Sequence, residues 1–415
     1  MGFVGDGAKR PLSSVVAILI STLAVLAVAI AAYAALVGED ASGPRIAQGV
    51  TGGAFHPVAG NFAPDGRVLD DCGEDYSCLQ QAFGNVAYRE GVKHALALFD
   101  AEIARNEHVR RDCHRIAHLI GSAAFARFDG DVARTFSVGS STCASGYYHG
   151  ILERAFVGVN TRTKLVDVAR ALCSGSGIRR RSFLDYQCRH GLGHGLMIQT
   201  GYDLPVSLAT CAELDTRWDD VVCTGGVFME NVTTRFGYRS SWLKDDDPLY
   251  PCDRVPQRNR RSCFLRSSVR IIAFHKNDFA KAAETCAGLS PHWSRACFRG
   301  YGRDAVGEAR YAPAKILSLC GLARTGQADC LFGAARTVGD GFGVAGARRS
   351  ARLCLRAPRP GRDSCFGGVG IIVGLLYATD TARREACATL AAGHAQTCAR
   401  AAIAEVNADG RAAWG

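Results

Sequence analysis

The chain has 415 residues, of which 48% are hydrophobic and 21% charged, and its formal net charge is +10. This composition excludes a wholly disordered chain, and the length is sufficient for a large buried core. The arginine clusters at residues 179–181 and 258–261 have few aromatic neighbours, so we interpret them as solvated loops and expect no nucleic-acid partner.

The first predicted element is a membrane segment at residues 15–37, which contain no charge and follow Lys9 and Arg10. As a helix it would be about 35 Å long, enough to cross a bilayer. The positive-inside rule places residues 1–14 in the cytoplasm and the remainder outside. Ala32 and Ala34 also fit a signal-peptide cleavage site, but the apolar run is long for a signal, so we favour an uncleaved anchor. Cleavage would instead give a secreted protein, and both alternatives export the rest of the chain.

Residues 38–70 are rich in Gly, Ala and Pro and have no hydrophobic period, which predicts a flexible linker. We assign residues 71–415 to one extracytoplasmic, cysteine-rich domain. At its start, Cys72 and Cys78 bracket a short acidic stretch. A calcium loop and a small disulfide-closed turn both fit this stretch, and we favour the disulfide.

From Cys78 onward the chain repeats a block of the form Cys-x-x-Gly followed by an apolar helical stretch. Successive opening cysteines lie 30 to 45 residues apart, and a period near 35 is the length of a two-helix unit. Between the blocks, a second amphipathic stretch ends in its own cysteine, as in residues 165–173 and 279–286. The opening cysteines are Cys78, Cys113, Cys143, Cys188, Cys223, Cys263, Cys297, Cys330, Cys365 and Cys398.

The 18 cysteines of an exported domain predict disulfides. The cysteine that ends one helix should pair with the one that opens the next, and each such bridge would contribute about 3 kcal/mol by chain entropy. Cys113 and Cys143 lack local partners and open neighbouring repeats, so we pair them with each other. The nine predicted pairs are Cys72–Cys78, Cys113–Cys143, Cys173–Cys188, Cys211–Cys223, Cys252–Cys263, Cys286–Cys297, Cys320–Cys330, Cys354–Cys365 and Cys387–Cys398.

The predicted fold class is therefore all-α. It is a disulfide-stapled array of α/α helical hairpins with a period of about 35 residues, either an open solenoid or a closed toroid. The array follows the N-terminal transmembrane helix.

Five of the 11 histidines lie between residues 113 and 197, in three blocks that each open with a cysteine. Each block holds two candidate ligands four residues apart, which on a helix share one face at about 6 Å. If the three helices are adjacent, these side chains would converge on one or two metal ions. The pairs are His114/His118, His149/Glu153 and His190/His194.

Alignment of the repeats separates scaffold from site. A histidine that the scaffold needed would recur with it, whereas these concentrate in residues 113–230. The alternative is that these are core histidines hydrogen-bonded to backbone carbonyl groups. This explains a single histidine well, but it does not explain why all five lie in neighbouring repeats. Glycines also crowd these blocks, either because the helices pack tightly or because a substrate needs open space. Six positions after the opening cysteine, the successive repeats from Cys143 carry His149, His194, Met229, Val269, Arg303, Arg336 and Ile371.

Five imidazoles and one carboxylate suit zinc, copper or iron, and not calcium or magnesium, which take oxygen ligands. Because every cysteine is assigned to a disulfide, we expect no thiolate ligand. Two ions with three ligands each and a single ion with further histidines around it fit equally well. Glu153 is either a ligand or a general base beside a metal-bound water, Glu230 is a second catalytic candidate, and Asp304 is a weaker one.

These features predict a membrane-anchored extracytoplasmic protein with a transition-metal site in its N-terminal repeats, acting as an oxidative or hydrolytic enzyme. The alternative is a non-catalytic helical-repeat scaffold that binds a protein or glycan partner. Loss of the aligned histidines after Cys223 favours a localised site over a uniform binding face.

Overall fold

The computed structural model describes Gly2 and residues 62–407, apart from 141, 157, 160, 175–177 and 233–239. The predicted cytoplasmic segment 1–14 (Gly2 excepted), the membrane segment 15–37 and the linker as far as residue 61 lie outside the described residues. Within the described part, no helix is long and apolar enough to cross a membrane.

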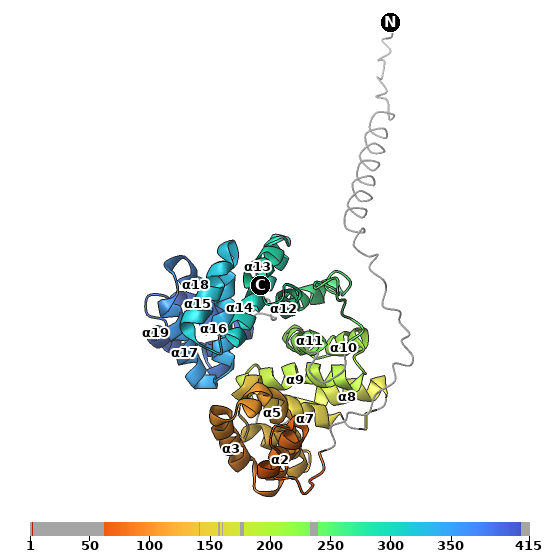
Figure 1. Cartoon of the computed structure of the whole chain (residues 1–415). Coiled ribbons are helices and arrows are strands. Elements are labelled where there is room, and N and C mark those ends of the chain that lie inside the picture. The colour runs from red at the N-terminus through yellow and green to blue at the C-terminus, as the bar shows by residue number, and fades with distance from the viewer. Residues whose placement is uncertain are drawn as a thin grey trace. The chain divides into compact units, whose positions relative to one another are not determined.

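The described residues form helices and no strands, which confirms the predicted all-α class. The helices that contain the opening cysteines, here called the stacked helices, each pack against the next one in chain order (Figure 1). They are α2 (Tyr76–Arg89), α5 (Cys113–Arg127), α7 (Thr142–Ala155), α9 (Phe183–Gln199), α11 (Arg217–Val232), α12 (Gln257–Phe274), α14 (Pro291–Glu308), α16 (Gln327–Asp340), α18 (Arg359–Leu376) and α20 (Ala395–Asn407).

The other helices connect one stacked helix to the next, and two short 3-10 turns flank them. The connecting helices pack on a neighbouring stacked helix, except α8, which contacts α10, so one hairpin is the repeating unit that the period predicts. They are α3 (Val92–Arg105), α4 (Glu107–Arg111), α6 (Val132–Ser137), α8 (Arg162–Leu172), α10 (Leu204–Cys211), α13 (Phe279–Ala287), α15 (Pro313–Leu322), α17 (Gly343–Arg356) and α19 (Asp380–Leu390), with η1 (Leu69–Asp71) and η2 (Arg324–Gly326).

The turn that follows a stacked helix has the same form in several repeats. Two residues adopt positive φ, as at 201–202 after α9 and 276–277 after α12. A capping aspartate follows, Asp203 for α10 and Asp278 for α13, and accepts hydrogen bonds from backbone N–H groups of the new helix. The left-handed residues end one helix, and the cap starts the next in a new direction.

The structure contains all nine predicted disulfides, and no cysteine is free. In the typical case, Cys286 near the end of α13 is bonded to Cys297 in α14, with 5.5 Å between their Cα atoms. Cys113–Cys143 instead joins the two stacked helices α5 and α7, as the elimination argument predicts. The bridges therefore hold each hairpin to the following stacked helix.

The glycine three residues after the opening cysteine lets neighbouring stacked helices touch. A Cβ added to Gly300 would lie 1.9 Å from the carbonyl oxygen of Leu265, and one added to Gly333 would lie 1.9 Å from that of Arg299. Of the two explanations for the glycines in the histidine blocks, tight packing is the correct one. A Cβ on Gly150 would meet the His118 carbonyl oxygen at 1.8 Å.

The row of stacked helices curves back on itself, because α18 contacts α9. Arg179 donates to the Leu375 carbonyl oxygen at 3.0 Å, and Gln187 donates to Asp340 Oδ1 at 2.8 Å. We call the concave side of this row, where α18 approaches α9, the inner surface. Its buried apolar residues are Tyr186, Trp218, Val222, Leu265, Phe332, Ile371 and Leu375.

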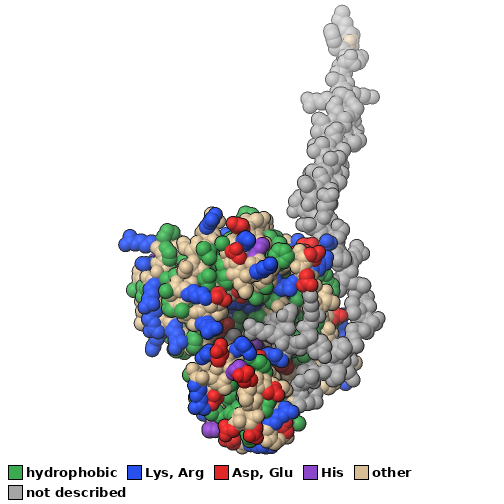
Figure 2. Space-filling model, viewed as in Figure 1, with side chains coloured by type: hydrophobic (Ala, Val, Ile, Leu, Met, Phe, Trp, Pro, Cys, Tyr) green, Lys and Arg blue, Asp and Glu red, His purple; other side chains and the backbone are tan. Residues whose placement is uncertain are grey.

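On the face visible in Figure 2, basic, acidic and apolar side chains are interspersed. Large exposed hydrophobic residues are scattered along the described chain, and include Val269, Val344 and Leu355. Single exposed residues of this kind are ordinary for a protein surface.

Candidate metal centre

The candidate site lies where α5, α7 and α9 stack side by side. The i,i+4 spacing places His114 and His118 on one face of α5, and His190 and His194 on one face of α9. His149 projects from α7, the helix between them. The glycine contacts bring the three backbones together, so side chains from different repeats meet at this level.

All five histidines converge in two overlapping groups. His114, His118 and His149 form one group, and His149, His190 and His194 form the other. Within each group, one candidate ligand atom per residue lies within 4.8 Å of the others. His149 belongs to both groups. The predicted convergence of the three helical blocks is therefore present in the structure.

The first group is held from α7. The Cys143 carbonyl oxygen lies 2.7 Å from His114 Nδ1 and accepts its hydrogen bond. Glu153 Oε1 lies 2.6 Å from His118 Nδ1. The two Nε2 atoms of His114 and His118 are 3.0 Å apart. Both rings thus use Nδ1 for orientation and direct Nε2 toward the centre.

The second group repeats this arrangement with residues of α9 and α11. Glu230 Oε2 lies 2.8 Å from His194 Nδ1, and Glu230 Oε1 accepts a hydrogen bond of 2.9 Å from the Tyr202 hydroxyl. Among the described residues, His194 Nε2 has no hydrogen-bond partner. The carboxylate orients the ring, and the tyrosine orients the carboxylate.

His149 stands between the groups with unsatisfied polar atoms. It is 1% exposed, and neither of its ring nitrogens has a hydrogen-bond partner among the described residues. His190 Nδ1 is also buried without a partner. Buried polar atoms are nearly always paired in folded proteins, so these nitrogens are suited to a ligand, and a metal ion would satisfy them.

The surroundings keep the central rings neutral, which is the form that binds metal. Burial, with the neighbouring histidines, lowers the pKa of His149 well below its ordinary value. Burial and the Arg266 charge do the same to the pKa of His190. Burial also acts to lower the pKa of His118, but the adjacent Glu153 carboxylate outweighs it and raises that pKa.

The two predicted catalytic carboxylates occupy matching places. Glu153 contacts Nδ1 of His118 and Glu230 contacts Nδ1 of His194, so each carboxylate lies on the opposite side of its ring from Nε2. Asp304 lies elsewhere, bound to Arg303 and Ser268. Sequence reasoning missed Tyr202, because it follows α9 in a turn and reaches Glu230 only through the packing of α9 on α11.

The chain matches no protein-family model, no curated protein and no solved structure.

Proposed function

We propose that this chain is an exported metalloprotein whose five-histidine centre binds transition-metal ions. The observation that carries the proposal is the pair of three-histidine groups that share His149. Five imidazoles brought together from three helices, with carboxylates behind two of them, match the ligand and second-layer pattern of metal sites.

The ligand set selects the class of metal. Imidazole nitrogen suits zinc, copper and iron, and no cysteine is free to contribute a thiolate. Three protein ligands would leave a tetrahedral ion with an open position for water or substrate. Bound zinc would supply hydrolytic chemistry, whereas copper or iron would supply oxidative chemistry, so the metal itself distinguishes the two enzyme classes.

The chain's own residues would prepare this centre in defined ways. Glu153 and Glu230 favour protonation of Nδ1 on His118 and His194, which leaves Nε2 as the electron-pair donor. Burial excludes bulk water and disfavours protonation of His149. Binding of one ion through one nitrogen of His149 therefore requires no proton release from an imidazolium, whereas sharing the ring between two ions would release its remaining N–H proton.

Metal analysis of the purified full-length chain tests the proposal. After loading and desalting, we expect about one to two equivalents of one transition metal, falling below about 0.2 equivalents in His149→Ala. His292→Ala, an exposed histidine of α14, is the matched control and should keep the wild-type content. A folded wild-type protein that takes up no transition metal would refute the proposal.

Copper(II) titration tests whether His149 is shared. If two ions bind the two groups through the two ring nitrogens of His149, this ring must release its N–H proton to solvent, and the resulting imidazolate would couple the two copper spins, so the paramagnetic signal would be smaller than two isolated ions give. His149→Ala should then abolish the coupling together with most of the binding. Two fully independent copper signals in the wild type would show that the groups do not share this ring.

We also propose that residues 15–37 anchor the chain, with residues 71–415 outside the cytoplasm. Nine disulfides support an oxidising compartment for the folded domain. Protease added outside intact cells should digest the domain and spare a membrane-bound N-terminal fragment. Recovery of the domain in the soluble cytosolic fraction with reduced thiols would contradict this placement.

A further inference from the structure

The repeat scaffold is interrupted at Arg266. From Cys143 to Cys365, the third residue after each opening cysteine is glycine, except in α12, where it is Arg266. Elsewhere this glycine lets two stacked helices touch. In α12 a long cationic side chain occupies the position instead, so this helix cannot approach its predecessor in the same manner.

The Arg266 side chain is buried and incompletely paired. It is 5% exposed, its Nε has no hydrogen-bond partner, and its Nη1 lies 3.5 Å from the Met229 sulfur, a weak acceptor. Within the described residues it forms no ion pair with a carboxylate. A buried guanidinium without a carboxylate partner is costly, and this cost points to a missing anion.

Two further arginines lie near Arg266 at equivalent places in their repeats. Arg303 and Arg336 stand six residues after Cys297 and Cys330, where the metal-centre repeats carry His149 and His194. Burial and the charges of Arg303 and Arg336 lower the pKa of Arg266 to about 9, although Tyr186 and Asp304 act in the opposite direction. The half-buried Arg303 and Arg336 are thus close enough to the buried Arg266 for their charges to act on it.

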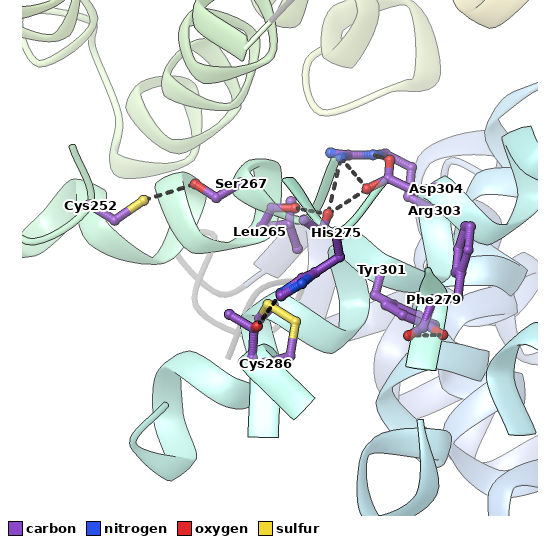
Figure 3. The surroundings of a disulfide bond; sticks show 12 residues. Cys252, Leu265, Ser267, His275, Phe279, Cys286, Tyr301, Arg303 and Asp304 are labelled. Atoms are coloured by element: carbon purple, nitrogen blue, oxygen red, sulfur yellow. Dashed lines mark hydrogen bonds and ion pairs between the residues drawn. A yellow bond between two sulfur atoms is a disulfide. The ribbon is translucent and has the colours of Figure 1, made fainter. Parts of the chain in front are cut away.

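Arg303 is held by contacts that leave one of its N–H groups available, and Arg336 is held against an aromatic ring. Arg303 Nε and Nη2 donate to Asp304, which also accepts from Ser268, while Arg303 Nη1 is buried without a partner (Figure 3). The Arg336 guanidinium lies over the Tyr186 ring, 5.4 Å from its centroid. The Asp304 carboxylate, which lies near these arginines, is thus already paired with Arg303.

Asp340 is the second acidic group near these arginines. Its Oδ1 accepts a hydrogen bond from Gln187, and burial raises its pKa even though Arg336 and Arg266 favour the ionised form. A third carboxyl group, Glu405, faces Arg336, and burial raises its pKa to about 7, so Asp340 and Glu405 are both biased toward their neutral forms. The region therefore keeps an excess of positive charge.

This positive region adjoins the histidine centre. Tyr186, which lies under Arg336, stacks on His190 with 5.7 Å between ring centroids. A Cβ added to Gly225 would lie 3.5 Å from His190 Nδ1 and 3.7 Å from Arg266 Nη2. The unpartnered nitrogen of His190 and the Arg266 guanidinium thus approach the same point on α11.

We propose that Arg266, Arg303 and Arg336 bind a small oxyanion on the inner surface, beside His190. Guanidinium groups present planar pairs of N–H donors that match carboxylate and phosphate oxygens. An anion there would neutralise the unpaired charge and satisfy the free donors. This anion site is separate from the proposed metal site, because the arginines and their contacts do not require a metal ion at the histidines.

Calorimetric titration of the full-length, metal-free chain at constant ionic strength tests the site, with inorganic phosphate and acetate as separate probes. We expect saturable binding of at least one probe at one site per chain, weakened about tenfold or more in Arg266→Met. Arg266→Lys should retain part of the affinity, because it keeps the charge without the planar fork. Arg170→Met, a surface arginine paired with Glu213, is the matched control and should bind as the wild type does.

Three results would overturn the proposal. They are no saturable binding of either probe, unchanged affinity in Arg266→Met, and binding that requires prior zinc loading, which would assign the anion to the metal. If Arg266→Met does not fold, as judged by circular dichroism, Arg303→Met and Arg336→Met replace it with the same criteria. The metal content of folded Arg266→Met should stay at the wild-type level, so failure here is distinct from failure of the metal site.

Discussion

At the scale of single residues, the site depends on which ring nitrogen each histidine exposes. His118 and His194 lie on different helices, yet each presents Nδ1 to a glutamate, Glu153 and Glu230 respectively. The i,i+4 pattern brings ligands to one face but does not determine ring orientation. The glutamates supply it, and we therefore interpret them as positioning residues.

We predict that Glu230→Gln weakens zinc affinity about 10- to 100-fold. The amide keeps the size of the side chain but loses the charge that favours the Nδ1–H form of His194. Competition with a chromophoric chelator measures the change. Tyr202→Phe, which keeps the carboxylate and removes one of its hydrogen bonds, should have a smaller effect. Unchanged affinity in Glu230→Gln would show that His194 does not need this partner.

At the scale of helices, the contact between stacked helices is made at the backbone. Glycines recur where one helix crosses a carbonyl oxygen of the previous one, as Gly333 does at Arg299. Glycine lowers helix propensity by about 1 kcal/mol relative to alanine. Close backbone packing along the row offsets this cost. Glycine should therefore increase the free energy of unfolding where the helices are crowded and decrease it where the position is open.

We predict opposite signs for two alanine substitutions. Gly333→Ala should reduce the free energy of unfolding by about 1–3 kcal/mol or more, because its Cβ would lie 1.9 Å from a backbone carbonyl oxygen. Gly307→Ala, in α14 with no atom within 4 Å of the added Cβ, should increase it by about 0.5–1 kcal/mol. Denaturant unfolding of both variants tests the packing, and equal effects would contradict it.

Removal of two different disulfides should distinguish effects on stability from effects on metal binding. Replacing Cys286 and Cys297 by serine should cost about 3 kcal/mol of stability and leave the metal content unchanged, because this bridge joins α13 to α14. Replacing Cys113 and Cys143 should lower both, since this bridge joins α5 to α7 and Cys143 supplies the carbonyl that orients His114. Thermal unfolding and metal analysis of the two double variants give the comparison.

At the scale of the whole domain, the last helix closes the inner surface. Glu405 of α20 is fully buried, and both of its carboxyl oxygens lack a hydrogen-bond partner in the described part of the chain. Burial raises the pKa of Glu405 to about 7, although Arg336, Trp218 and Arg181 favour the ionised form. Since Trp218 belongs to α11 and Arg336 to α16, the charge of Glu405 reports on the packing of distant repeats.

We predict that this packing weakens as pH rises. The folded-state pKa of Glu405 lies above the ordinary value of 4.5, so the folded state binds more protons between pH 4.5 and about 7. Stability from this group is present below that window and decreases across it by up to about 1.4 kcal/mol per pH unit. Glu405→Gln should be less pH-dependent over this window in urea unfolding, and a parallel pH profile would contradict the assignment.

The all-α class, the repeat period, the nine disulfides and the five histidines that meet could all be predicted from the amino-acid sequence. These features are local: a helix period, a cysteine a few residues from its partner, and an i,i+4 pair lie within one or two repeats. Even Cys113–Cys143 follows from them, because every other cysteine had a nearer partner.

The way in which the repeats combine could not be predicted from the sequence and is visible in the three-dimensional structure. This structure shows that His149 belongs to both histidine groups, that Glu153 and Glu230 orient rings, and that Arg266 lies beside His190. These relations depend on how far each helix rotates and shifts against the next. A repeat pattern predicts which residues face the neighbouring repeat. The curvature that brings distant repeats together arises from the sum of all the contacts between repeats, so the pattern does not predict it.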